Sequence, residues 1–478
     1  MLFSSPTFLY FFLPLALLLH WLSGKRLRNL ILLTLSLIFY AWGEPKYVLI
    51  LLLSILLNWG VGKLFTADIP KKNYILIAGC SANILLLVFF KYFGFLLGIA
   101  GLNKTIEGYL SIEINSIHLP IGISFFTFQA ISYLIDVYKG KVSPQKSLID
   151  FGLYLSLFPQ LIAGPIVRYT DVVVDIKKRV FSLNNLTDGF SRFIIGLSKK
   201  VLLANPAGEL ADQIFTSNYL DLSSQAAWIG VIAYTIQIFY DFSGYSDMAI
   251  GIGKMLGFRF PENFNYPYIS KSIQEFWRRW HITLSTFFRD YVYIPLGGSR
   301  VSKVRIYSNI LIVFLLTGLW HGASWNFIVW GLYHGFFLCL ERLFLSSILK
   351  KSISLVSHIY TLLIVCIGWV IFRIENISAM AAYLARLVST HPQGLSANDL
   401  AAGNYSESMI AISLGAILSI PIISFIKNRL LSLRADSIWW APSSRNRFLE
   451  STTVSILLLL CIVKISTAAY NPFIYFRF

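Results

Sequence analysis

Charged residues are scarce in this sequence. Only 13% of its 478 residues are Asp, Glu, Lys or Arg, whereas 56% belong to the hydrophobic types. Soluble domains carry roughly 25% charged residues, so the shortage excludes an ordinary soluble enzyme. Several apolar stretches reach about 18 residues or more, which is the length needed to cross a bilayer. The chain is therefore predicted to be an all-α protein that crosses the membrane several times.

Cysteine is scarce too, and each of the four cysteines lies in an apolar run. Their spacing excludes a disulfide framework and a cysteine-based metal site, and no metal is expected. The glycines at 251, 253 and 257 follow no predicted strand, so a nucleotide-binding fingerprint is excluded as well. The cysteines are Cys80, Cys339, Cys366 and Cys461.

Acidic residues are outnumbered by basic ones. The chain has 23 Asp and Glu against 40 Lys and Arg, a net charge of +17. In a soluble protein this balance would favour nucleic-acid binding. Here the basic residues lie mainly in short loops between apolar runs, such as 25–28 and 71–72, so the positive-inside rule explains them. We expect membrane lipid rather than nucleic acid around the protein, with both of these loops on the inner side.

The apolar runs predict roughly eleven transmembrane or re-entrant helices in one membrane-embedded domain, residues 1–478. Pro120 and Gly122 predict a broken helix at the start of one run. Three polar stretches are expected to be loops, at 94–116, 209–224 and 376–406. The runs lie at 7–23, 28–43, 46–65, 73–93, 118–139, 226–256, 305–321, 324–344, 354–372, 408–426 and 451–468.

Ionisable residues inside these runs are the first functional candidates. Asp241 and Asp247 share one run, at a cost of ~2.5–3.5 kcal/mol each on insertion scales. His321 lies in another, and imidazole is well suited to proton transfer near neutral pH. A hydrogen-bonded packing role between helices is the alternative for His321. His334 is a further candidate, whereas the histidines at 20, 118, 358 and 391 are expected to be structural or exposed.

The stretch from Ser272 to Glu341 carries two motifs rich in tryptophan and histidine. They are Glu275-Phe-Trp-Arg-Arg-Trp-His-Ile-Thr-Leu-Ser285 and Thr317-Gly-Leu-Trp-His-Gly-Ala-Ser-Trp325. These motifs resemble the membrane-bound O-acyltransferase (MBOAT) family. The likeness is greatest to the bacterial branch that O-acetylates cell-envelope polysaccharides such as alginate and peptidoglycan. Further matching segments are 118–168, 237–251 and 471–478.

The resemblance implies an MBOAT fold around a central tunnel and an O-acetyltransferase activity. His321 matches the family's essential histidine, and His281 matches a position near the tunnel. Acetyl-CoA is the implied acyl donor, and no bound cofactor is expected. Because Arg and Lys pair well with phosphate, basic residues on the inner side are expected to hold the donor's phosphates, although positive-inside anchoring alone explains about half of them. These residues are Arg278, Arg279, Arg300 and Lys303, in a cluster that also contains Arg289 and Arg305.

The C-terminal sequence Asn471-Pro-Phe-Ile-Tyr-Phe-Arg-Phe478 resembles the acyl-carrying tail of this branch. By that resemblance, 471–478 is an acyl-acceptor tail and Tyr475 is the covalent acceptor, with His321 as its base. Composition alone favours the alternative, an interfacial aromatic belt. The resemblance also implies an extracytoplasmic partner, an SGNH-type acetyltransferase or a carrier protein, and a cell-envelope polysaccharide as the final acceptor.

Two other functions stay open at this point. D-alanyl transfer to teichoic acid from a carrier protein uses a comparable tail, but on a separate small peptide, so the built-in tail argues against it. A non-enzymatic transporter would fit the helices and the buried charges equally well, but it needs neither a reactive tyrosine nor paired Trp-His motifs. In each case the predicted location is the bacterial inner membrane, as a multi-pass protein.

Overall fold

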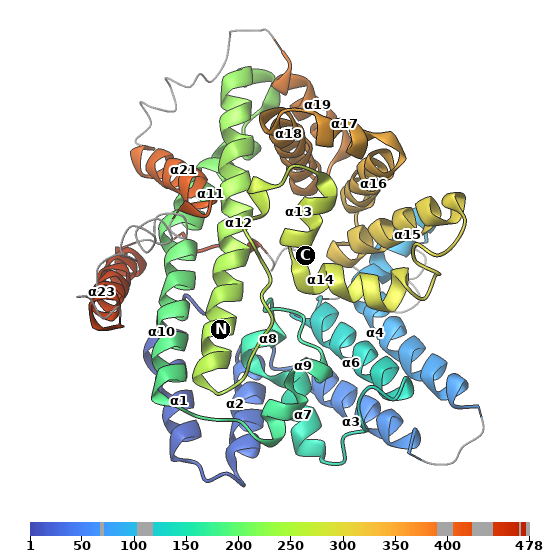
Figure 1. Cartoon of the computed structure of the whole chain (residues 1–478), viewed down its shortest axis with the longest axis vertical. Helices are drawn as coiled ribbons and strands as arrows, with labels where there is room; N and C mark the ends of the chain where they lie inside the picture. The colour runs from blue at the N-terminus through green and yellow to red at the C-terminus, as the bar shows by residue number, and fades with distance from the viewer. Residues whose placement is uncertain (67–70, 103–117, 390–404, 423–442, 468–469, 475–478) are drawn as a thin grey trace. The chain divides into compact units, whose positions relative to one another are not determined.

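The computed structural model describes residues 1–66, 71–102, 118–389, 405–422, 443–467 and 470–474. These residues form helices and no β-strand (Figure 1), which confirms the predicted all-α class. In this part of the chain, five helices are long and apolar enough to cross a membrane, and the expected number of about eleven segments stays a prediction. The five are Lys72–Ala100, Lys303–His321, Trp325–Lys351, Ser354–Arg373 and Leu449–Thr467.

The chain divides into two compact units. The first unit comprises residues 1–193 and 248–261, and the second comprises 194–247 and 262–478. The long helix α12 (Ser224–Met255) contributes to both units. The expectation of one membrane domain over 1–478 stays a prediction.

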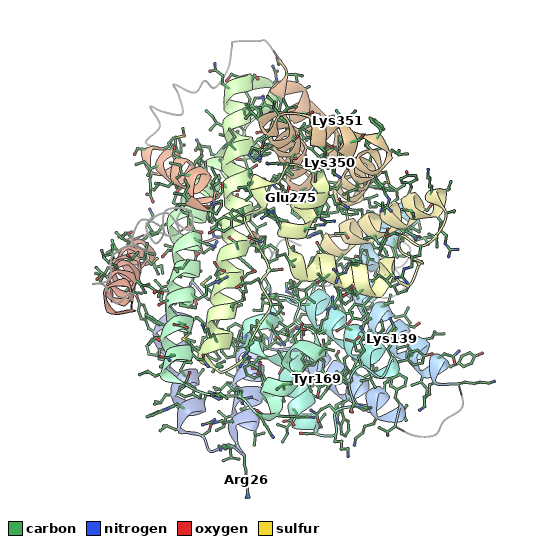
Figure 2. All side chains as sticks on the ribbon, viewed as in Figure 1. Arg26, Lys139, Tyr169, Glu275, Lys350 and Lys351 are labelled. Carbon is green, nitrogen blue, oxygen red and sulfur yellow. The ribbon has the colours of Figure 1, made fainter. Side chains whose placement is uncertain are left out.

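The first unit starts with apolar helices joined by short turns, of which the one before α2 is basic. The predicted runs 28–43 and 46–65 correspond to α2 (Arg28–Gly43) and α3 (Val48–Leu64). Arg26, in the turn before α2, points away from the protein (Figure 2). Further helices of this unit are α1 (Leu13–Leu22), α4 (Lys72–Ala100), α6 (Ile123–Tyr138), α7 (Leu148–Ser156), α8 (Phe158–Leu161), α9 (Tyr169–Lys177) and the first part of α10 (Leu183–Ser198).

The expected break before α6 is present. Gly122 adopts a left-handed φ of 79° immediately before the helix begins. A Cβ atom there would overlap the carbonyl oxygen of Leu161, so the turn requires glycine. By contrast, the expected loop at 94–116 starts too early, because α4 continues to Ala100. Residues 103–117 of that loop lie outside the described residues.

The second unit contains α12 together with helices from both motif regions. Its interior is a large apolar cluster that includes Phe242, Trp280, Trp330, Phe372 and Ile474. The remaining elements are π-helix η3 (Lys199–Ala204), α11 (Asn205–Thr216), α13 (Ile273–Arg279), α14 (Ile282–Phe288), π-helix η6 (Arg289–Tyr293), α15 (Lys303–His321), α16 (Trp325–Leu340), π-helix η7 (Glu341–Leu345), α17 (Ser346–Lys351), α18 (Ser354–Arg373), α19 (Ile377–Leu387), α21 (Ser406–Leu418) and α23 (Ser443–Thr467).

Two of the expected loops are wrong in part, because they contain amphipathic helices. Residues 209–216 belong to α11, whose Leu210 and Ile214 are fully buried. Residues 377–387 form α19, whose Tyr383 is fully buried. Such helices bury one apolar face and expose polar residues on the other. Neither helix contains a long apolar run. In the sequence, their mixture of polar and apolar residues therefore resembles that of a loop.

Candidate active site

His321 is the last residue of α15 and lies in an aromatic pocket. Only 4% of its surface is exposed. Its ring centroid lies 4.9 to 5.0 Å from those of Trp320, Trp330 and Phe372, each in an edge-on arrangement. The polar ring is thus enclosed by apolar faces. A group placed in this way meets its reaction partners in a low-dielectric environment, where electrostatic interactions are strong.

The position of His321 depends on a close crossing of α15 and α16. Gly318 on α15 and Gly331 on α16 meet at this crossing. A Cβ on Gly318 would overlap the carbonyl oxygen of Phe327, and one on Gly331 would overlap that of Phe314. Small residues allow apolar helices to approach this closely. The crossing brings Trp330 of α16 against His321 of α15.

His281 lies at the start of α14 and has an unusual backbone. It adopts a left-handed φ of 43°, a conformation that is uncommon for residues other than glycine. Its side chain is 1% exposed. Such backbone conformations cost about 1–3 kcal/mol and tend to cluster at functional sites.

Asn263 determines which nitrogen of His281 carries the proton. The Oδ1 atom of Asn263 lies 3.0 Å from Nδ1 of His281, and it also accepts hydrogen bonds from the backbone N–H and the hydroxyl of Thr283. Because a backbone N–H can only donate, this atom of Asn263 must be the carbonyl oxygen. The neighbouring Nδ1 of His281 must then be the protonated nitrogen, and it donates to Asn263.

The other nitrogen of His281, Nε2, therefore carries the lone pair. It is buried and has no hydrogen-bond partner among the residues that the structure describes. Burial lowers the pKa of His281 to about 3, so the ring is neutral near pH 7. A neutral imidazole with an open Nε2 can accept a proton. Asn263 could not be predicted from the sequence, because it lies in a loop outside the matched motifs.

The structure brings the two predicted catalytic histidines together. Trp320 lies between them, with ring centroids 5.9 Å from His281 and 4.9 Å from His321. His334 joins the same group, because its ring contacts Trp277 at 5.1 Å and Trp330 at 5.2 Å. We call these three histidines and their three tryptophans the histidine cluster.

A cavity of about 890 Å³ lies next to the histidine cluster. Trp277 is shared, because it lines the cavity and contacts His334. Of the four predicted donor-binding residues, Arg278 lines the cavity, whereas Arg279, Arg300 and Lys303 are not among the described lining residues. Arg289, from the same predicted basic cluster, also lines it, and so does Arg342, which was not predicted.

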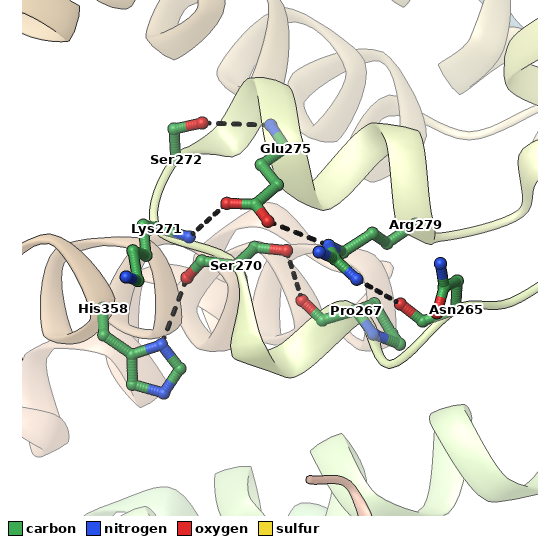
Figure 3. A network of polar contacts seen from close by, with 8 residues as sticks. All are labelled: Asn265, Pro267, Ser270, Lys271, Ser272, Glu275, Arg279 and His358. Atoms are coloured by element: carbon green, nitrogen blue, oxygen red, sulfur yellow. Dashed lines mark hydrogen bonds and ion pairs between the residues drawn. The ribbon is translucent and has the colours of Figure 1, made fainter. Parts of the chain in front are cut away.

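Arg279 is instead engaged in a local network (Figure 3). Its Nε donates to Glu275 at 2.9 Å, and its Nη1 donates to the carbonyl oxygen of Asn265 at 3.0 Å. The helix that carries it, α13, is held at its start by Glu341. The buried Glu341 carboxylate accepts hydrogen bonds from the backbone N–H groups of Ile273 at 2.6 Å and Gln274 at 3.0 Å. A carboxylate at a helix N-terminus is stabilising, so Glu341 fixes the helix from which Arg278 enters the cavity.

The described part of the C-terminal tail is inserted into the second unit. The backbone N–H of Ile474 donates to Asp241 on α12 at 2.9 Å. Asp241 pairs with Lys200 at 2.7 Å, and Lys200 also donates to the carbonyl oxygen of Pro472. Phe473 stacks on Tyr245 with ring centroids 4.7 Å apart. These contacts anchor residues 472–474 of the tail.

The tail and His281 contact the same turn of α12, the tail through Asp241 and His281 through Phe242. Phe242, the residue after Asp241, packs its ring against His281 with centroids 4.7 Å apart. Lys200 is only 3% exposed, because it neutralises the buried Asp241. Tyr475, the predicted acyl acceptor, lies outside the described residues and follows directly after Ile474 in the sequence.

Comparison with known proteins supports the family resemblance of the tryptophan-histidine motifs. The family model described as membrane-bound O-acyltransferase matches residues 141–382. The chain belongs to this family. The match covers α12, both tryptophan-histidine motifs and all three histidines of the cluster. MBOAT membership makes the chain an O-acyltransferase, and together with the apolar helices it confirms the predicted multi-pass location in the bacterial membrane.

Several bacterial proteins are similar to this chain. A protein of Azotobacter vinelandii named probable alginate O-acetylase AlgI is 40% identical over the full length of both chains. The peptidoglycan O-acetyltransferase of Helicobacter pylori is 33% identical, over 100% of this chain and 98% of its own. The teichoic acid D-alanyltransferase of Bacillus subtilis is 30% identical, but over 53% of this chain and 68% of its own.

Proposed function

We propose that the protein transfers an acetyl group from cytoplasmic acetyl-CoA to Tyr475, for O-acetylation of a cell-envelope polysaccharide outside the membrane. The observation that carries this proposal is the anchor of the tail: Asp241 holds Ile474, and the adjacent Phe242 contacts His281. The acceptor residue therefore follows a segment fixed on the helix turn that touches the histidine cluster.

The relatives support acetyl rather than D-alanyl transfer. The two whose names state O-acetylation of alginate or peptidoglycan match this chain from end to end, whereas the D-alanyltransferase matches about half of it. The tail anchor adds to this argument, because the chain carries its own acyl-acceptor motif. Membership in an enzyme family also favours acyl transfer over the transporter alternative.

The first proposed step is the transfer of the acetyl group from the thioester to the phenol of Tyr475. A histidine accepts the phenol proton, which a phenol of pKa ≈ 10 does not release readily by itself. We assign this role to His321 by the family resemblance, with His281 as the second base because its Nε2 carries a lone pair. The phenol oxygen bonds to the carbonyl carbon, the C–S bond breaks, and the thiolate of coenzyme A leaves with the proton.

The cavity is the proposed site of the donor. Arg278, Arg289 and Arg342 line it, and guanidinium groups pair well with phosphate oxygens. Thr317 also lines it, one turn before His321 on α15. A thioester with its phosphates on the arginines would therefore extend toward the histidine cluster. Of the other predicted basic residues, Arg300 and Lys303 retain the anchoring role of a basic turn.

The second proposed step needs a protein partner outside the membrane. A nucleophile of an SGNH-type acetyltransferase attacks the acetyl-tyrosine ester, so that the phenol of Tyr475 is regenerated. The partner then passes the acetyl group to a polysaccharide hydroxyl. Each step exchanges one acyl bond for another, so no oxidant, reductant or bound cofactor is required.

Mass spectrometry of the purified full-length protein, incubated with labelled acetyl-CoA, tests the first step. We expect one acetyl group per chain on Tyr475, no label in Tyr475→Phe and strongly reduced label in His321→Ala. Tyr470→Phe is the matched control, because it removes the tyrosine directly before the tail, whose hydroxyl donates to Asp212 at 2.7 Å, and it should keep the label. Acetyl label of wild-type extent in Tyr475→Phe would refute the role of the tail.

A further inference from the structure

Arg179, in the first unit, has a buried guanidinium that lacks hydrogen bonds. Its Nε, Nη1 and Nη2 atoms are all buried, and none has a hydrogen-bond partner among the residues that the structure describes. A guanidinium offers five N–H donors and stays charged, and burying such a group without partners is costly. The Cζ atom of Arg179 lies over the ring of Phe258, 4.7 Å from the ring centroid. This contact supplies no hydrogen-bond acceptor of the ordinary N or O kind to the guanidinium.

Distant chain segments converge around Arg179. Gly257, with a left-handed φ of 84°, passes so close that a Cβ there would lie 3.3 Å from the Cβ of Arg179. His20 of α1 contacts the neighbouring Phe181, with ring centroids 6.4 Å apart, and lies within electrostatic reach of Arg179 and Arg28. His20 is 1% exposed, and its Nδ1 has no hydrogen-bond partner in the described part of the chain.

The charges nearest to Arg179 leave it without a counter-ion in direct contact. Arg28 repels it and, after burial, is the second cause that lowers the pKa of Arg179, to about 10. Asp150 and Asp175 attract it, but none of its three nitrogens has a hydrogen-bond partner among the described residues. Asp150 accepts a hydrogen bond from the side chain of Asn29 at 2.7 Å, and Asp175 accepts one from the backbone of Arg259 at 3.0 Å.

The unused donors suit a phosphate. A guanidinium edge matches two phosphate oxygens in a bidentate arrangement, and Arg28 supplies a second positive charge. The site lies at the turn between the apolar helices α1 and α2, where Leu22 and Leu27 are exposed. By the positive-inside rule this basic turn faces the cytoplasm, and the cytoplasmic leaflet is rich in anionic lipids, which attract basic segments.

We propose that Arg179 and Arg28 bind the phosphate of an anionic phospholipid head group, such as that of phosphatidylglycerol. The phosphate diester takes the guanidinium edge of Arg179. A hydroxyl of the glycerol head group donates to Nδ1 of His20, which supplies the missing partner of that nitrogen. The lipid thereby links α1, α2 and the segment around residue 179. The site is separate from the acyl-transfer chemistry, and it stands whether or not Tyr475 carries the acetyl group.

Native mass spectrometry of the delipidated full-length protein in neutral detergent tests this site. The probes are phosphatidylglycerol, phosphatidylcholine and inorganic phosphate, each titrated separately. We expect the wild type to prefer phosphatidylglycerol, and Arg179→Gln to bind it about tenfold more weakly or worse, because charge-assisted hydrogen bonds are lost. Arg26→Gln is the matched control, because Arg26 belongs to the same basic turn but points away (Figure 2). It should bind as the wild type does.

Each outcome decides the proposal. If inorganic phosphate binds as tightly as the lipid and is lost in Arg179→Gln, the phosphate site holds but the lipid assignment is overturned. Equal losses in Arg26→Gln and Arg179→Gln would reveal a diffuse basic surface and refute the site. Unchanged binding in Arg179→Gln would refute it as well. If Arg179→Gln fails to fold, Arg28→Gln replaces it. We expect Arg28→Gln to bind phosphatidylglycerol severalfold more weakly than the wild type, and unchanged binding would refute the proposal.

Discussion

Asn263 offers a direct test of how His281 works. Replacing it with leucine removes the acceptor of three buried donors, namely Nδ1–H of His281 and the N–H and O–H of Thr283. Each unsatisfied donor costs about 1–3 kcal/mol. The imidazole proton is then free to move to Nε2, which becomes a donor and no longer a base. A wrong tautomer of a catalytic histidine can lower a rate by up to about 10⁴-fold.

Asn263→Asp separates this effect from a loss of structure. The carboxylate keeps the acceptor for all three donors, and the hydroxyl of Ser246, which now accepts from Asn263 at 3.1 Å, can turn and donate. Its negative charge beside the ring favours the imidazolium, which typically raises a pKa by about 1–3 units. From the value of about 3 that burial gives His281, its pKa would move to roughly 4–6. The loss of activity on the acid side should shift to higher pH by the same amount.

The assay is single-turnover acetyl transfer, followed as label on the protein across a pH series for the wild type and both variants. We expect Asn263→Leu to be slow at every pH, and Asn263→Asp to be near wild type at pH 8 but to lose activity earlier on acidification. A leucine variant at the wild-type rate, or an aspartate variant with an unshifted profile, would refute the assignment of the proton to Nδ1.

Two further experiments test the anchor of the tail and the lowered pKa of His281. Asp241→Asn leaves Lys200 buried without its carboxylate, at a cost of about 3–5 kcal/mol, and weakens the anchor of Ile474. Label on the tail should fall more than in Lys254→Gln, which breaks the exposed pair with Asp188, and equal effects would contradict the anchor. Because the pKa of His281 is lowered from 6.5 to about 3, its contribution to stability is complete above pH 6.5 and is lost progressively toward pH 3. At pH 5 the loss is about 2 kcal/mol. His281→Gln should therefore show a shallower fall in the thermal midpoint between pH 7 and 5, and parallel curves would contradict the shift.

The apolar helices could be predicted closely from the sequence. Runs 28–43 and 305–321 correspond to α2 and α15 because a lipid-facing helix needs an unbroken apolar run. The amphipathic α11 and α19 could not, because their burial depends on a protein surface that the local sequence does not reveal. The same limit applies to Lys200, whose partner lies 41 residues away on another helix.

The candidate site was predictable as motifs but not as geometry. The two tryptophan-histidine motifs identified His281 and His321, and the structure adds that both rings contact Trp320. Asn263 lies 18 residues before His281, and a single asparagine in a loop carries no periodic or motif signal. Arg342 was missed for a similar reason, because it enters the cavity from η7, which follows the second motif by some distance along the chain.

The glycine crossing of α15 and α16 limits how this protein can be engineered. Exchanging helical glycine for alanine is a common way to raise thermal stability, because it restricts the unfolded chain. At Gly318 and Gly331 the same exchange would place a methyl group onto the opposing backbone. The two helices would separate, and the ring of Trp330 would withdraw from His321. Thermostabilised variants should therefore be sought among other positions, and a library that leaves both glycines fixed will retain more active members.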